Sequence, residues 1–163
     1  MNCPPYTQYT LILFHRHCLG GDYDVVINRS NLNNNDGHKI PMQKEIEYPK
    51  YNSGKTDGDW AILVLEEAAP SNQPLVRPNS QDSYPPVGEQ LTVMGYGDTN
   101  PSDYVSDLSD KLKKVNVNAI SNADCDDSSD GRDDYYNQIS DNMLCANVNG
   151  GGKDACQVRI VCS

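Results

Sequence analysis

The sequence is short of basic residues and has no long hydrophobic run. Lysine and arginine together number 13, against 23 aspartate and glutamate residues, which gives a formal net charge of −10. Nucleic-acid backbones are bound by clusters of Lys and Arg, so this balance argues against a nucleic-acid partner. The apolar run near the start, residues 11–14, is too short for a signal-peptide core or a membrane span. We therefore expect no membrane partner and no signal peptide within this sequence, and an exported form would begin upstream of residue 1.

Metal-binding patterns are also scarce. The chain has 3 histidines, and its 6 cysteines form no Cys-x-x-Cys pair, so we expect neither a zinc site nor a cofactor. An even number of cysteines in a polar chain favours disulfides and an oxidising compartment, although their spacing alone selects no pairing. One N-glycosylation acceptor sequon, Asn28-Arg29-Ser30, is compatible with export.

The apolar fraction is low, and no long segment repeats with the period of a helix. An apolar content of 37% with 12 glycines and 10 prolines indicates a loop-rich β protein. Residues 61–65 are uninterruptedly apolar, which predicts a strand buried on both faces. Residues 115–118 alternate, which predicts a strand with one wet face, and Ser121 is placed to cap a short helix. Further strands are expected at residues 25–27, 40–46 with a break at Pro41, 91–97 and 143–146.

A proline-rich connector, residues 70–86, separates two halves of the chain. Its length and polarity predict a bridge between two packed parts. We therefore expect a single all-β domain over residues 1–163, with one part at residues 1–69 and the other at residues 87–163.

Four short stretches carry a recognisable pattern, in this order: His17-Cys18, Asp59 before the apolar run 61–65, Gly95-Tyr96-Gly97, and the segment 142–157. Together they resemble the chymotrypsin/trypsin family of serine peptidases, in which the catalytic histidine, aspartate and serine follow one another in that order along the chain. The resemblance implies a chymotrypsin-like double Greek-key β-barrel, with the first barrel mostly present and the second incomplete. It also implies a serine endopeptidase, a hydrolase of polypeptides.

The resemblance assigns His17 as the general base and Asp59 as the carboxylate that orients it. A serine hydroxyl becomes a nucleophile only when an imidazole removes its proton, and a buried carboxylate holds the required ring tautomer. His15 is the neighbouring candidate, but it lacks the adjacent cysteine. Asp57 competes with Asp59, but only Asp59 closely precedes the apolar strand as the motif requires.

The resemblance also assigns a specificity residue, disulfides and partners. Asp154 matches the floor of the primary specificity pocket, where a carboxylate pairs with a substrate Lys or Arg. Family pairing joins Cys3 with Cys18 and Cys125 with Cys145, and leaves Cys156 and Cys162 without an assigned partner. The implied partners are a polypeptide substrate or a peptidase inhibitor, and the implied state is a secreted, extracellular monomer.

The pattern departs from the family after Gln157. The family continues Gly-Asp-Ser-Gly-Gly, whereas this chain has Val158, Arg159, Ile160, Val161 and Cys162. Ile160 stands where the nucleophile belongs, and Val158 replaces a glycine whose N–H helps to form the oxyanion hole. Ser163 comes three positions too late to substitute. The sequence therefore reads as truncated before the catalytic serine motif, and we expect little or no peptidase activity.

Two alternatives come from other functional classes. One is a non-catalytic homologue that uses the same fold as a binding surface. The other is a calcium-binding module, because residues 126–134 match early positions of an EF-hand loop. Asn137 stands where that loop needs a bidentate glutamate, so a solvated acidic loop is the preferred interpretation.

Overall fold

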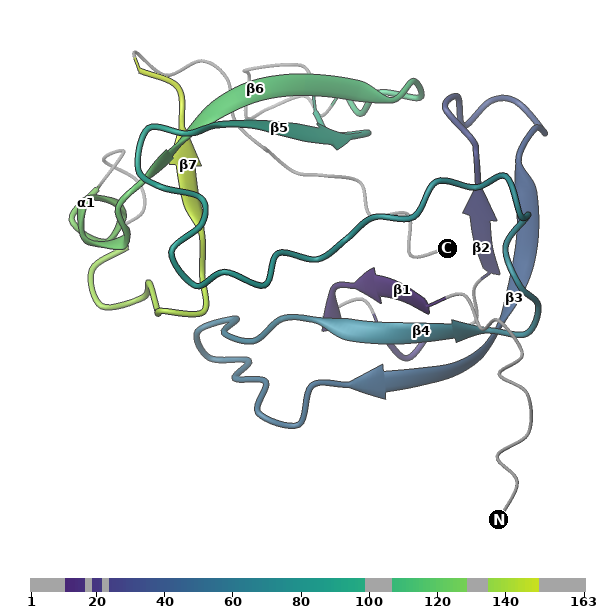
Figure 1. Ribbon diagram of the computed structural model, residues 1–163, viewed down its shortest axis with the longest axis horizontal. Helices are drawn as coiled ribbons and strands as arrows, with labels where there is room; N and C mark the ends of the chain where they lie inside the picture. The colour runs from purple at the N-terminus through teal and green to yellow at the C-terminus, as the bar shows by residue number, and fades with distance from the viewer. Residues whose placement is uncertain (1–10, 17–18, 22–23, 99–106, 129–134, 150–163) are drawn as a thin grey trace. The chain divides into compact units, whose positions relative to one another are not determined.

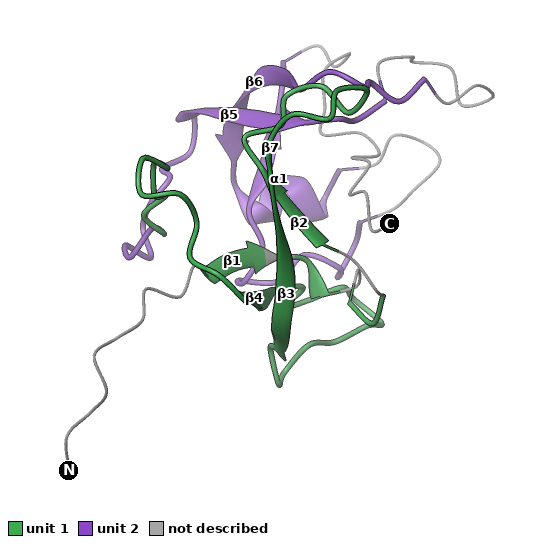
Figure 2. Cartoon of the chain, turned by 90° about the vertical axis from the view of Figure 1, so that its right-hand side faces the viewer, with its two compact units in different colours: residues 1–78, 161–163 green, residues 79–160 purple. Residues whose placement is uncertain are grey.

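The computed structural model describes residues 11–16, 19–21, 24–98, 107–128 and 135–149 (Figure 1). Within these residues the chain forms seven strands in two sheets and one helix of five residues, which confirms the predicted all-β class. The chain divides into two compact units, residues 1–78 with 161–163 and residues 79–160 (Figure 2). No helix in the described part of the chain is long and apolar enough to cross a membrane.

The first unit contains a four-stranded antiparallel sheet in the order β1-β4-β3-β2. Its strands are β1 (Leu11–Phe14), β2 (Asp24–Ile27), β3 (His38–Glu47) and β4 (Ala61–Leu65). The apolar run predicted as a buried strand is β4, which lies between β1 and β3 (Figure 1). β1 comes from residues 11–14, whose sequence carried no strand prediction.

The core of this unit lies on one face of β4. Ala61, Leu63 and Leu65 are at most 1% exposed, and Ile40 of β3 is fully buried. The alternate residues Ile62 and Val64 are only half-buried. The prediction that β4 is buried on both faces is therefore wrong for the second face, because successive side chains of a strand point to opposite sides.

The predicted break at Pro41 is also wrong, since β3 runs through it as a ten-residue strand. Pro41 lies where β3 changes partner: it pairs with Asp24 of β2, and the next residue, Met42, pairs with Leu65 of β4. Its carbonyl accepts a hydrogen bond from the Glu66 N–H at 3.0 Å. A proline at the end of one ladder and the start of another removes few ladder bonds, so the strand continues.

The second unit contains the antiparallel sheet β5-β6-β7, formed by β5 (Gln90–Gly95), β6 (Lys113–Ile120) and β7 (Cys145–Asn147). Val117 and Ala119 are buried, whereas Asn116 is exposed, so β6 has the predicted wet face. On that face Asn116 accepts a hydrogen bond from Thr92 at 3.0 Å. The last strand begins two residues later than predicted, at Cys145.

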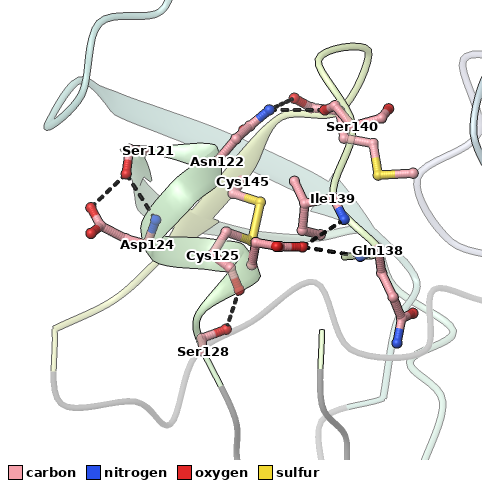
Figure 3. The surroundings of a disulfide bond; sticks show 11 residues. Ser121, Asn122, Asp124, Cys125, Ser128, Gln138, Ile139, Ser140 and Cys145 are labelled. Carbon is pink, nitrogen blue, oxygen red and sulfur yellow. Dashed lines mark hydrogen bonds between the residues drawn. A yellow bond between two sulfur atoms is a disulfide. The ribbon is translucent and has the colours of Figure 1, made fainter. Parts of the chain in front are cut away.

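A disulfide between Cys125 and Cys145 ties the helix to β7 (Figure 3). The helix α1 (Asn122–Asp126) is capped as predicted, because the Ser121 side chain accepts the Asp124 N–H. Asn122 donates from Nδ2 to the carbonyls of Ser140 and Met143, at 2.9 and 3.0 Å. These bonds secure the segment that leads from α1 into β7.

The Asp126 carboxylate organises the turn after the helix. One oxygen accepts the Asn137 N–H at 3.0 Å. The other accepts the N–H groups of Gln138 and Ile139, both at 3.0 Å (Figure 3). Asp126 was the first residue of the EF-hand alternative, and here its oxygens bond to backbone. Among the described residues no group of three or more His, Cys, Asp or Glu is placed to hold a metal ion.

Candidate active site

Asp59 is presented by a short turn that leads into β4. Gly58, just before it, has φ +70°, and a Cβ at this position would lie 2.7 Å from the Tyr48 ring. Just after it, Trp60 stacks on Tyr48 with ring centroids 4.5 Å apart, and the Tyr48 N–H donates to the Trp60 carbonyl at 3.3 Å. The glycine and the ring stack therefore hold the backbone on both sides of Asp59, whose side chain is 12% exposed.

The competing carboxylate, Asp57, occupies a different place. Its backbone forms an isolated antiparallel bridge with Asn52, with hydrogen bonds of 2.9 and 3.1 Å. The Asp57 backbone thus closes the turn, whereas the Asp59 side chain contacts a histidine that directly follows β1.

That histidine is His15. Its Nδ1 lies 3.4 Å from Oδ2 of Asp59, and its own side chain is 59% exposed. The contact follows from strand register, because Phe14 pairs with Ala61 and the chain then continues past β1 alongside the residues that precede β4. A separation of 3.4 Å lies at the long end for a hydrogen bond, so the pair is loosely joined.

Arg16, the next residue, holds this segment in place through contacts with the end of β3 and with the turn that follows it. Its Nε and Nη2 atoms donate to Glu47 Oε2 at 3.2 and 3.0 Å, and its guanidinium lies 4.7 Å from the centroid of the Tyr51 ring. Exposed ion pairs add little stability, so the main effect of these contacts is positional. They keep the chain beside the Asp59 turn.

The structure describes some of the predicted site residues and not others. Asp59, Cys125 and Cys145 lie within the described residues, and the last two form a disulfide. His17, Asp154, Cys3 and Cys18 lie outside the described residues. The sequence pattern favoured His17 over His15, because Cys18 directly follows His17 and Arg16 follows His15. The signal that could have found its contact is register: an antiparallel pairing of residues 11–14 with 61–65 brings His15 next to Asp59.

This arrangement can hold an imidazole in a defined orientation. A carboxylate close to Nδ1 favours the tautomer with its proton on Nδ1, in which Nε2 carries the lone pair that can accept a proton. Asp59 is the less exposed partner, whereas the 59% exposure of His15 leaves the contact open to screening by water.

Comparison with known proteins identifies the family. The family model described as Trypsin matches residues 7–158. Trypsin-1 of Salmo salar is 32% identical over 146 residues, which cover 86% of this chain and 55% of that protein. Trypsin eta of Drosophila melanogaster is 30% identical over 147 residues, covering 86% of this chain and 53% of that protein.

A third relative gives the same picture. Trypsin-10 of Gadus morhua is 31% identical over 143 residues, covering 86% of this chain and 56% of that protein. The chain thus spans about half the length of the curated relatives it matches. Its two antiparallel sheets agree with the double β-barrel of these peptidases. The chain therefore belongs to the chymotrypsin/trypsin-like family of serine peptidases.

Proposed function

We propose that this chain is a trypsin-like endopeptidase domain in which Asp59 orients the catalytic imidazole of His17. The observation that supports this best is the Asp59 turn: a carboxylate with 12% side-chain exposure contacts an imidazole at 3.4 Å. That imidazole belongs to His15, two residues before His17. The same short segment therefore supplies both rings, and the adjacent Cys18 favours His17 as the base.

In this proposal the roles follow from acid–base chemistry. The base removes the proton of a serine hydroxyl as it attacks the scissile carbonyl, and later returns a proton to the leaving amine. Asp59 stabilises the imidazolium that forms between these steps. Residues 1–69 form the first barrel, residues 70–86 the connector, and residues 87–163 contribute to the second barrel.

Substrate preference in this proposal depends on Asp154. A carboxylate at the base of a pocket selects Lys or Arg side chains by a charge-assisted hydrogen bond. The net charge of −10 would also attract cationic peptides over longer distances. The partners are then polypeptide substrates or peptidase inhibitors, met outside the cell by a monomeric domain.

We further propose that a polypeptide with this sequence has little or no peptidase activity of its own. Position 160, where the family places the nucleophile, carries isoleucine, which has no hydroxyl. Position 158 carries valine in place of an oxyanion-hole glycine, and valine does not readily adopt glycine-only backbone conformations. Without a nucleophile the base has no hydroxyl proton to remove, and Asp59 has no imidazolium to stabilise. Recognition of peptides or inhibitors would then be the remaining function of the fold.

The first experiment tests the absence of activity. The purified 163-residue chain is incubated with peptide esters of arginine and lysine, and hydrolysis is compared with that of its His17→Ala variant. We expect equal background rates. Hydrolysis that a serine-directed inhibitor abolishes and that His17→Ala removes would contradict the proposal.

The second experiment tests the roles of His17 and Asp59. Residues 158–163 are replaced by Gly-Asp-Ser-Gly-Gly, followed by the matching C-terminal region of the salmon trypsin-1. In an active chimera, Asp59→Asn should reduce kcat by a factor on the order of 10⁴, and His17→Ala by a factor on the order of 10⁶. His15→Ala is the matched comparison. A larger loss with His15→Ala than with His17→Ala would transfer the role of base to His15.

A further inference from the structure

The loop that joins β2 to β3 begins at Asn28, directly after the last residue of β2. Asn28 is exposed and has φ +62°, in the left-handed region that asparagine adopts more readily than most residues. Ser30, two residues later, is also exposed. The backbone thus turns at Asn28 with its side chain in solvent.

The two ends of this loop, residues 28–37, are held close together. Gly37 has φ +94°, and a Cβ there would lie 2.8 Å from the Ile27 carbonyl oxygen, so the backbone at the end of the loop lies close to the backbone at its start. Arg29 donates from Nε to the Asp36 carbonyl at 2.9 Å and so links the two ends of the loop. Arg29 is partly buried by these contacts, whereas its neighbours Asn28 and Ser30 stay accessible.

Asn28, Arg29 and Ser30 form an N-glycosylation sequon. The proposed peptidase function gives this sequon no role. An Asn-x-Ser sequence accepts an oligosaccharide only where x is not proline. Elsewhere in the sequence, Asn100-Pro101-Ser102 has the spacing but is excluded by its proline. A glycan also has to remain in solvent once the chain has folded, because it is bulky and polar. The exposed turn at Asn28 meets that condition.

We propose that Asn28 is an N-glycosylation site of this chain. The proposal rests on the proposed extracellular function, because glycosylation requires entry into the secretory pathway. The co-substrate is a lipid-pyrophosphate-linked oligosaccharide. Asn28 Nδ2 attacks the anomeric carbon of its first sugar, a C–N bond forms, and the C–O bond to the pyrophosphate breaks. The lipid pyrophosphate leaves with the electron pair, and one amide proton is released to solvent.

The experiment expresses the whole chain behind a cleavable signal peptide, by translation in the presence of microsomes from the endoplasmic reticulum. The signal peptide directs the chain into the lumen of the microsomes. The assay does not measure peptidase activity, so its result can be interpreted even if the proposed function is wrong. In the protease-protected fraction we expect a single upward mobility step that peptide N-glycosidase removes. Mass spectrometry should then find Asn28 converted to aspartate.

Three variants test the site itself. Asn28→Gln and Ser30→Ala should each abolish the mobility step, whereas Ser30→Thr should retain it, because threonine also completes the sequon. Ser30→Ala leaves Asn28 and its turn intact, so it separates loss of the acceptor signal from misfolding. A protected wild-type chain without the glycan, or a step that persists in Ser30→Ala, would overturn the proposal.

Discussion

The two units of this chain are stabilised in different ways. In the first unit β4 lies in the middle of its sheet, and the fully buried side chains of Leu63 and Leu65 supply the core. In the second unit the buried residues are smaller, Val117 and Ala119 on β6 and the half-cystine Cys145. There the disulfide and the side chains of Asn122 and Asp126 hold loop to strand. Where little apolar area is buried, crosslinks and hydrogen bonds to backbone carry more of the stability.

The largest effect is expected for Leu63→Ala in the first unit. Removing a side chain that is 1% exposed should lower the free energy of unfolding by about 4 kcal/mol, through lost transfer energy and the cavity left behind. The chain has one tryptophan, Trp60, so its fluorescence during urea unfolding reports on this unit. Leu75→Ala, at a site 81% exposed, is the control and should change stability by less than about 0.5 kcal/mol. Equal losses from both would refute a core centred on β4.

The next largest effect is expected in the second unit, for the double variant Cys125→Ala/Cys145→Ala. The disulfide joins residues separated by 20 positions, and its removal should cost about 3 kcal/mol, because the unfolded chain regains the entropy of an open loop. Hydrogen exchange of α1 and β7 measures the loss, while the Trp60 unfolding curve should shift far less. A shift of the same size in both units would show that they do not differ in the way described.

Asp126→Asn should have a smaller and more local effect. The amide keeps one oxygen but turns an NH₂ group toward a backbone N–H, so about 2 kcal/mol of local stability should be lost. Faster hydrogen exchange at residues 137–139 is the expected signature. Asp141→Asn removes the same charge at an exposed site and should leave these amides unchanged. Unchanged exchange in Asp126→Asn would mean that the carboxylate does not organise this turn.

The smallest effect is expected for Ser121→Ala at the start of α1. This change removes the acceptor for the Asp124 N–H and should cost about 1 kcal/mol. Ser121→Thr keeps a hydroxyl that can accept the Asp124 N–H and donate to Asp124 Oδ2, and it should recover most of the loss. Exchange of the helix amides is the measurement, and a loss that Ser121→Thr does not recover would argue against capping as the cause.

Local sequence was informative where one physical rule dominates. The uninterrupted apolar run predicted β4, the alternation at residues 115–118 predicted the wet face of β6, and Ser121 predicted a helix cap. The rules failed where a partner decides the outcome. Pro41 stays within a strand because β3 changes neighbours there. Ile62 and Val64 remain half-buried because they point to the opposite face of the sheet from the core residues Ala61, Leu63 and Leu65.

In the candidate site, too, local sequence predicted one feature and missed a long-range contact. Sequence spacing singled out Asp59 ahead of Asp57, and it favoured His17 over His15 because Cys18 directly follows His17. The contact between His15 and Asp59 joins residues 44 positions apart and depends on the register of β1 against β4. The sequence of residues 11–14 does not by itself predict that register.

The sequence by itself indicated the family, through its resemblance to known motifs, and it supplied the residue types available for catalysis. It also determined the all-β class, because that follows from composition and local pattern. The tertiary structure alone decided which imidazole lies 3.4 Å from Asp59, and how the Asp126 carboxylate is satisfied by a turn eleven to thirteen residues away. The physical reason is that both are long-range contacts. Their geometry is set by strand pairing and chain closure, which no short stretch of sequence encodes.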